Sequence, residues 1–253
     1  MNKIQMFMIQ AVTMLIALSA CTSEKRYKIQ EISVSRVLMD KSFDTQDGQQ
    51  MQALVDSFKV LMDAKMCEEI GFSAQDLVKG KPQSLLGNFT ADAMFDFGKE
   101  TWGNVDFAIT NIGGIRATLN KGEITVGELY EIYPFENQIV CLELKSASVE
   151  KLFRTLASKA GEVLSKNIEF VINGKDFESL KIGGKLVDKD KIYRVVTVDY
   201  LAEGNDNMSA LTEAVTTLES NVLIRDVIIS NIRKLTSANR KVESQLDNRI
   251  KIK

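Results

Sequence analysis

The stretch DFAITNIGGIRATLNKGEITVGELYEIYPFEN, residues 106–137, carries the strongest fold signal in the chain. Its apolar start at residues 107–109 predicts a buried strand, and the polar turn TNIGG follows at residues 110–114. Arg116 comes two residues after Gly114. Paired glycines at the end of a strand can bring backbone N–H groups and an arginine close to an anion. We therefore expect an anion-binding turn where this strand ends.

A second turn, PFEN, stands at residues 134–137. Phe135 offers a flat ring for stacking, and Asn137 offers an amide two residues later. A ring and an amide at this spacing suit a planar base. A phosphate site followed by a base site suggests a nucleotide.

Hydrophobic periodicity on both sides of this stretch predicts helices and strands that alternate without a strict βαβ repeat. A helix entered from Thr125 and another capped by Ser146 are expected, and Asn173-Gly174 predicts a turn between two paired strands. The fold class is α+β (mixed α/β), a mixed β-sheet packed with helices. Expected helices are residues 51–66, 85–97, 125–130, 146–157 and 221–235; expected strands are 29–35, 105–109, 138–144, 168–172, 180–182 and 192–198; expected loops are 44–50 and 78–84.

The two turns resemble the C-terminal, substrate-binding domain of the 5'-nucleotidase family, in which NGGGIR and PFGN stand at these places. Two more segments follow the family's order: LGN at residues 86–88 and DYLAEGND at residues 199–206. The resemblance covers about residues 77–211. It implies the same mixed-sheet fold and a substrate site built from Asn111, Gly113, Gly114, Arg116, Phe135, Asn137, Tyr200 and Asp206.

The resemblance also implies a role for each part of that site. Arg116 would contact the substrate phosphate, while Phe135 and Tyr200 would form the two walls of a clamp around the base. Asn137 would contact the base, and Asp206 would contact the nucleoside. Stacking of a base on an aromatic ring contributes roughly 1–3 kcal/mol per contact.

Plainer interpretations exist for each of these residues. Arg116 could be a solvated arginine after a tight turn, and Phe135 a core residue where a strand begins. Tyr200 could be a half-buried aromatic at a strand end, and Asp206 a turn-capping residue. The loop at residues 79–84 is the weakest part of the likeness: Lys79 or Lys81 stands where some members have phosphate-binding arginines, and a solvated loop fits equally well.

Departures from the family pattern favour an alternative, a non-catalytic binding or scaffold lipoprotein that has lost nucleotide binding. Ile112, Glu136 and Asn205 each replace a usual glycine. Glu136 adds negative charge near an anionic ligand, whereas asparagine at position 205 tolerates a left-handed backbone. A third option is a non-nucleotide substrate, because related two-domain hydrolases act on sulfur-linked groups.

Metal chemistry is not expected in this chain, which has 253 residues and no histidine. Full family members carry an N-terminal metallophosphoesterase domain whose two-metal centre uses several His, Asp and Asn ligands. We expect no cofactor here, and divalent metals only in a separate metallophosphoesterase partner. A formal net charge of −2 gives no signal for nucleic-acid binding.

The N-terminus predicts a lipid anchor. Lys3 precedes an apolar run at residues 6–18, too short to span a membrane comfortably, and LSAC at residues 18–21 matches the lipobox of bacterial lipoproteins. An ordinary signal peptide followed by a chance Cys21 is the alternative. We expect a signal peptide at residues 1–20, a tether and first strand at 21–40 and the domain at 41–253. The expected location is the bacterial cell envelope, anchored by lipid at Cys21 in the outer membrane.

The two remaining cysteines, Cys67 and Cys141, could form a disulfide. Cys141 lies in a predicted buried strand and Cys67 in a predicted helix. Two independent buried thiols are the preferred interpretation.

Overall fold

The computed structural model describes residue 2, residue 6, residue 8, residues 31–37 and residues 46–253. The predicted signal sequence, Cys21 and most of the tether lie outside the described residues. Residues 31–37 form no strand, and Ile32 and Val34 are 73% and 90% exposed. The expected strand at 29–35 is therefore wrong for its described part, because two apolar residues with no pairing edge cannot hold an extended segment in a sheet.

The compact unit spans Ala53–Lys253. Its core alternates helices and strands, as the periodicity predicted. In chain order the described elements are α2 Gln46–Met66, β1 Glu69–Ser73, α3 Leu85–Trp102, β2 Phe107–Thr110, η2 Ile112–Gly114, β3 Gly122–Thr125, α4 Val126–Ile132, β4 Gln138–Lys145, α5 Ser146–Ser158, β5 Val163–Leu164, β6 Ile168–Asn173, β7 Asp176–Ile182, β8 Lys185–Leu186, β9 Ile192–Val198, α6 Asp199–Ala202, η3 Asn205–Asn207, η4 Ser209–Glu213, β10 Thr216–Leu223, α7 Ile224–Ser237 and β11 Ile250–Ile252.

The largest described sheet is mixed, with strand order β10-β4-β9-β2-β5. β2 runs parallel to β9, whereas β4 pairs antiparallel with both β9 and β10. A second sheet has the order β11-β6-β7-β8, and β1 pairs with β3. This arrangement of a mixed sheet with packed helices confirms the predicted α+β class.

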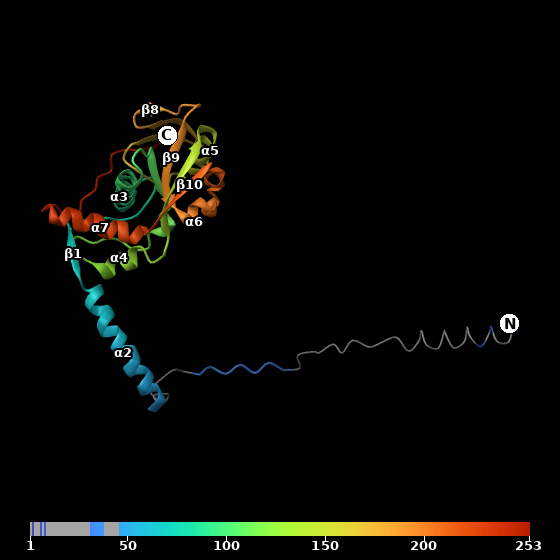
Figure 1. Cartoon of the computed structure of the whole chain (residues 1–253), viewed down its shortest axis with the longest axis vertical. Coiled ribbons are helices and arrows are strands. Elements are labelled where there is room, and N and C mark those ends of the chain that lie inside the picture. Colours follow the sequence, from blue (N-terminus) through green and yellow to red (C-terminus); the bar gives the residue numbers. More distant parts are fainter. Residues whose placement is uncertain (1, 3–5, 7, 9–30, 38–45) are drawn as a thin grey trace. The chain divides into compact units, whose positions relative to one another are not determined.

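Helices cover the main sheet and join it to a second hydrophobic cluster. Figure 1 shows α3 and α5 on either side of β9, and α7 next to α4 and β1. α3 contributes Met94 to the cluster around the main sheet and Leu86 to the cluster shared with α4 and α7. Gly98 lets α3 approach β9, because a Cβ there would lie only 2.4 Å from a methyl carbon of Val196.

Local signals explain where several elements begin. The predicted entry at Thr125 is confirmed: its hydroxyl accepts a hydrogen bond from the Glu128 amide, and the Glu128 carboxylate accepts one from the Thr125 amide. The predicted Ser146 cap is wrong, because Ser146 already belongs to α5 and its hydroxyl donates to the Lys189 carbonyl. The β6–β7 hairpin is confirmed, with Gly174 at φ 62° in its turn.

Several boundaries differ from the expectation. Residues 46–50, expected as a loop, form the first turns of α2. α7 begins at Ile224 rather than residue 221, because residues 216–223 pair with β4 as β10.

The apolar stripe of α2 is confirmed as helical, yet Leu54, Phe58 and Met62 are more than half exposed. No helix in the described part of the chain is long and apolar enough to cross a membrane.

Candidate functional site

The predicted anion turn lies where β2 ends, as a short 3₁₀ turn. β2 is buried along its whole length and Asn111 is 5% exposed, whereas Arg116 is exposed. Four of the backbone N–H groups in this turn already have protein acceptors. They are the amides of Ile112 to Glu162 Oε2 at 2.8 Å, Gly114 to Asn111 O at 3.1 Å, Ile115 to Ile112 O at 3.3 Å and Arg116 to Ile132 O at 2.8 Å.

These bonds correct one expectation from the sequence. The four amides are not free to cradle an anion, because an N–H that donates within the protein is lost to a ligand. The exposed guanidinium of Arg116 is the cation that the turn presents instead. One of its nitrogens, Nη1, lies 3.3 Å from the Gly113 carbonyl, which holds the arginine side chain back over its own turn.

The paired glycines serve close packing. Neither Gly113 nor Gly114 adopts a positive φ. A Cβ at Gly114 would lie 2.9 Å from Oδ1 of Asn111, so a larger residue would collide with the buried amide. Ile112 stands where the family usually has glycine, and this backbone accepts it without a left-handed conformation.

Asn111 and Tyr200 both bind the carboxylate of Asp206. The Asn111 amide donates to Asp206 Oδ2 at 2.5 Å, and the Tyr200 hydroxyl donates to Asp206 Oδ1 at 3.2 Å. The negative charge of Asp206, more than the partial desolvation of the phenol, raises the pKa of Tyr200 above its ordinary value. The structure therefore brings three of the predicted site residues together from segments far apart in sequence.

The backbone of the third segment differs from the expectation. Asparagine at position 205 is not the left-handed residue. Gly204, Asp206 and Asn207 have positive φ angles of 87°, 54° and 61°, and the side chain of Asn205 donates to the Tyr200 carbonyl. This sharp turn directs the Asp206 carboxylate back toward Asn111.

Phe135 lies beside Arg116 and is 46% exposed, so the alternative of a core phenylalanine is wrong. The Arg116 guanidinium carbon is 5.9 Å from the centre of the Phe135 ring, a cation–π contact. Tyr200, the other predicted clamp wall, is 38% exposed. Residues of both predicted turns line a small hollow. Its lining residues are Thr110, Asn111, Gly114, Ile115, Tyr133, Phe135, Asn137 and Ile224.

One buried polar atom at this hollow lacks a partner. Oδ1 of Asn111 has no hydrogen-bond donor among the described residues, although its Nδ2 is satisfied by Asp206. A buried acceptor without a donor costs about 1–3 kcal/mol. A ligand hydroxyl or amine that donated to this atom would remove that cost.

Sequence reasoning missed two residues behind the turn, Lys159 and Glu162. Glu162 is 4% exposed and accepts the Ile112 amide, and Lys159 donates to the Asp206 carbonyl at 3.0 Å. The loop at 79–84 does lie against the turn, since the Lys79 ammonium donates to the Ile115 carbonyl at 2.5 Å. No local pattern marks Lys159 or Glu162, because only the folded chain brings them to the turn.

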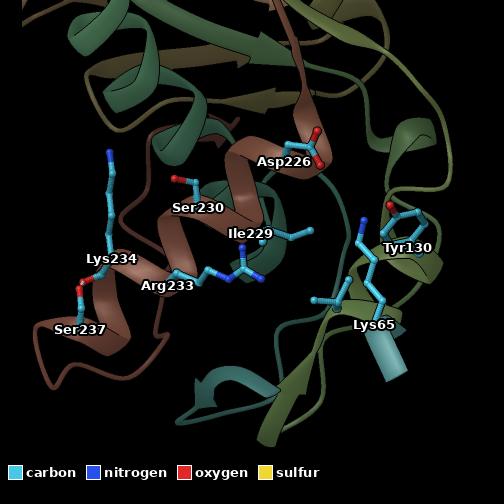
Figure 2. A pocket seen from close by; sticks show the side chains of 9 residues that line it. Lys65, Tyr130, Asp226, Ile229, Ser230, Arg233, Lys234 and Ser237 are labelled. Carbon is cyan, nitrogen blue, oxygen red and sulfur yellow. Dashed lines mark hydrogen bonds between the residues drawn. The ribbon is translucent and has the colours of Figure 1, made fainter. Parts of the chain in front are cut away.

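A larger hollow of about 550 Å³ lies elsewhere, between α7, α4 and the end of α2 (Figure 2). Arg233 and Lys65 approach it from opposite sides, whereas Lys234 points away from Lys65 (Figure 2). Arg233 and Lys234 are paired with Glu68 and Glu100. None of the predicted site residues lines this hollow, and two of its cations, Arg233 and Lys234, already have carboxylate partners, so we favour the smaller hollow at the end of β2.

A metal centre of the kind the family uses does not fit the described residues. Among residues 46–253 no cluster of three or more metal-ligating side chains could hold an ion. Asp206 is the one carboxylate among the predicted site residues, and both of its oxygens accept hydrogen bonds.

The fold is that of the C-terminal part of 5'-nucleotidases. The solved 5'-nucleotidase precursor from Thermus thermophilus superposes with a TM-score of 0.69 at 26% identity, covering 81% of this chain and 43% of that one. The family model described as 5'-nucleotidase, C-terminal domain matches residues 67–213, more than half of the sequence. The chain therefore belongs to the 5'-nucleotidase C-terminal domain family.

Curated relatives agree with this assignment. The trifunctional nucleotide phosphoesterase protein YfkN of Bacillus subtilis (strain 168) is 28% identical over 228 residues, which cover 82% of this chain and 15% of the relative. Protein UshA of Yersinia enterocolitica is 33% identical over 105 residues, covering 40% of this chain and 19% of UshA. The chain thus spans less than half the length of each of these three proteins.

Proposed function

We propose that this protein is the nucleotide-binding part of a 5'-nucleotidase-type hydrolase. The observation that carries the proposal is the hydrogen-bonded link from Asn111 through Asp206 to Tyr200 beside an unpartnered, buried Asn111 oxygen. Asn111 also lines the small hollow that is formed by both predicted turns. Membership of the family supports the same conclusion.

Each side chain has a distinct task in this proposal. Arg116 binds the phosphate, because it is the exposed cation of the turn. Phe135 and Tyr200 stack on the base, and Asn137 contacts its edge. Asp206 is held by Asn111 and Tyr200 so that it meets the nucleoside in a fixed orientation. Gly113 and Gly114 keep the turn thin enough for the ligand to reach Asn111.

Hydrolysis would need metal ions from another polypeptide segment. We propose that a separate metallophosphoesterase supplies the divalent metals and the activated water, while this chain selects and holds the nucleotide. The full sequence contains no histidine, which supports this division of labour. We further propose lipidation at Cys21, which would place the protein on the bacterial cell envelope, in the outer membrane.

Calorimetry with two ligands tests the binding proposal. The full chain carrying Cys21→Ser is titrated with AMP and with adenosine. Arg116→Ala should weaken AMP about tenfold or more and leave adenosine unchanged, because only AMP has a phosphate. Phe135→Ala should weaken both. Arg233→Ala is the matched control, since it removes an exposed, ion-paired arginine outside the site. Absence of heat with both ligands would refute the proposal.

A second candidate is a scaffold lipoprotein without nucleotide binding. Two observations favour it: protein acceptors occupy four amides of the turn, and Arg116 lies over the face of Phe135. In that case the double variant Arg116→Ala/Phe135→Ala would leave association with a metallophosphoesterase unchanged, and there would be no nucleotide affinity to lose. A clear drop in affinity would exclude the scaffold.

A further inference from the structure

Glu162 lies directly behind the candidate turn, between α5 and β5. Its side chain is 3% exposed, and its Oε2 accepts the Ile112 amide at 2.8 Å. This hydrogen bond joins the first residue of the 3₁₀ turn to a segment 50 positions away. A hydrogen bond to a charged acceptor is roughly twice as strong as one between neutral groups. The carboxylate therefore fixes the turn from its buried side.

Two ammonium groups hold that carboxylate in place. Lys81 Nζ and Lys159 Nζ each lie 3.5 Å from Oε1 of Glu162. Lys81 also donates to the Lys159 carbonyl at 2.8 Å, and Lys159 donates to the Asp206 carbonyl at 3.0 Å. A buried carboxylate is tolerated only when it is paired and hydrogen-bonded, and Glu162 satisfies both conditions.

The backbone around Glu162 is shaped for this contact. Gly161 has φ 97°, and a Cβ there would lie 2.7 Å from the Pro82 carbonyl oxygen. Its amide donates to the Leu156 carbonyl, which ends α5 and turns the chain toward β5. This close passage of residue 161 against the 79–84 loop places Glu162 between that loop and the turn.

We propose that Glu162 is the positioning residue of the nucleotide site. It touches no ligand itself. Through Ile112 it sets the turn that carries Asn111 and Arg116, and through Lys159 it sets the backbone of Asp206. The proposal rests on the proposed function, because it names the residue that aligns the phosphate and nucleoside contacts of the same site.

Amide hydrogen exchange in the nucleotide-free protein is the first readout. Glu162→Ala removes the acceptor of the Ile112 amide, so exchange at Ile112 should rise about tenfold or more. Glu162→Gln retains a side-chain oxygen that accepts the same N–H, so Ile112 should stay protected. Glu169→Ala is the control, because it deletes an exposed glutamate paired with Lys181 on another sheet.

AMP affinity is the second readout. Glu162→Ala should weaken AMP about tenfold, whereas Glu162→Gln and Glu169→Ala should stay within about threefold of the original chain. The proposal is overturned if exchange at Ile112 in Glu162→Ala matches the control, or if Glu162→Gln loses protection as Glu162→Ala does. A rise that extends equally to Val196 in the central strand would also overturn it, since that pattern reports global destabilisation.

The two readouts separate this proposal from the proposed function. If the original chain bound neither AMP nor adenosine, nucleotide binding would fail, yet the exchange rates would still decide whether Glu162 orders the turn. If AMP bound but exchange at the Ile112 amide did not change in Glu162→Ala, only the positioning role would be refuted.

Discussion

The side-chain amide of Asn111 donates a 2.5 Å hydrogen bond to Asp206, across 95 positions of sequence. This bond closes the candidate site, because it ties the turn after β2 to the turn after β9. Tyr200 binds the other oxygen of the same carboxylate. Asp206 is thus the residue at which these two segments of the site meet.

Replacing Asp206 should therefore weaken nucleoside binding. Asp206→Ala leaves the Asn111 amide and the Tyr200 hydroxyl without their acceptor, and we expect about tenfold to a hundredfold weaker adenosine binding by calorimetry. Asn207→Ala is the control, because Asn207 has a similar left-handed φ of 61° and an exposed side chain. Equal losses in both variants would show that backbone strain, not the carboxylate, causes the effect.

Tyr200 should titrate above an ordinary tyrosine. Its phenolate would be negatively charged beside Asp206, so the charged form is disfavoured and the pKa rises. Asp206→Asn removes that charge and should lower the pKa toward its usual value. The measurement is the ultraviolet absorbance of tyrosinate against pH, with Tyr200→Phe subtracted to isolate this residue. An unchanged pKa in Asp206→Asn would contradict the electrostatic cause.

The two thiols of the domain should react very differently. Both Cys67 and Cys141 are free; Cys67 is exposed and Cys141 is buried in β4. The preferred interpretation of independent thiols is thus confirmed, but only one of them is buried. Burial raises the pKa of Cys141 to about 11 because the thiolate is disfavoured away from water.

In the full chain carrying Cys21→Ser, a thiol reagent at pH 8 should modify Cys67 quickly and spare Cys141 until the protein is denatured. At that pH only about one Cys141 in a thousand would be ionised even if it were accessible. Mass spectrometry of the labelled peptides identifies the modified residue. Fast modification of Cys141 in the folded chain would argue against its burial.

Gly98 should be intolerant of even one added methyl group. A Cβ at this position would lie 2.4 Å from Val196 in β9, so Gly98→Ala should lower the free energy of unfolding by about 1–3 kcal/mol. Urea denaturation measures the change. Val196→Ala in the same chain should recover part of it, because it removes the methyl carbons that collide.

Gly80→Ala is the matched control for that experiment. Its new Cβ would approach only Ser84, at 3.9 Å, and its φ is not positive. We expect a change within about 0.5 kcal/mol. A large effect at Gly80, or no recovery with Val196→Ala, would mean that steric contact at β9 does not explain the result.

Much of the fold could be predicted from local pattern. β9 matches its predicted range, Thr125 caps α4, and Asn173-Gly174 joins β6 to β7. These signals act through neighbouring residues, so they are visible in sequence. β10 and β11 were missed because each is stabilised by a partner strand distant in sequence, and residues 31–37 lacked such a partner.

The candidate site, too, was predicted only in part from the sequence. The resemblance of the motifs to the family implied Arg116, Phe135 and Tyr200 as site residues, and the structure places Arg116 against Phe135 and Tyr200 on Asp206. The use of the turn amides was not predictable. Their acceptors include Glu162 and the Ile132 carbonyl, which reach the turn only in the folded chain.

Residue type, short-range spacing and the resemblance of the motifs were enough to predict the family, the mixed sheet and the side chains proposed to hold a nucleotide. The folded chain was needed to show that Asp206 is held by Asn111 and Tyr200, and that Glu162 lies behind the turn with Lys81 and Lys159. Such contacts depend on chain segments that meet through burial of a shared core, and no local pattern records which distant residues that burial brings together.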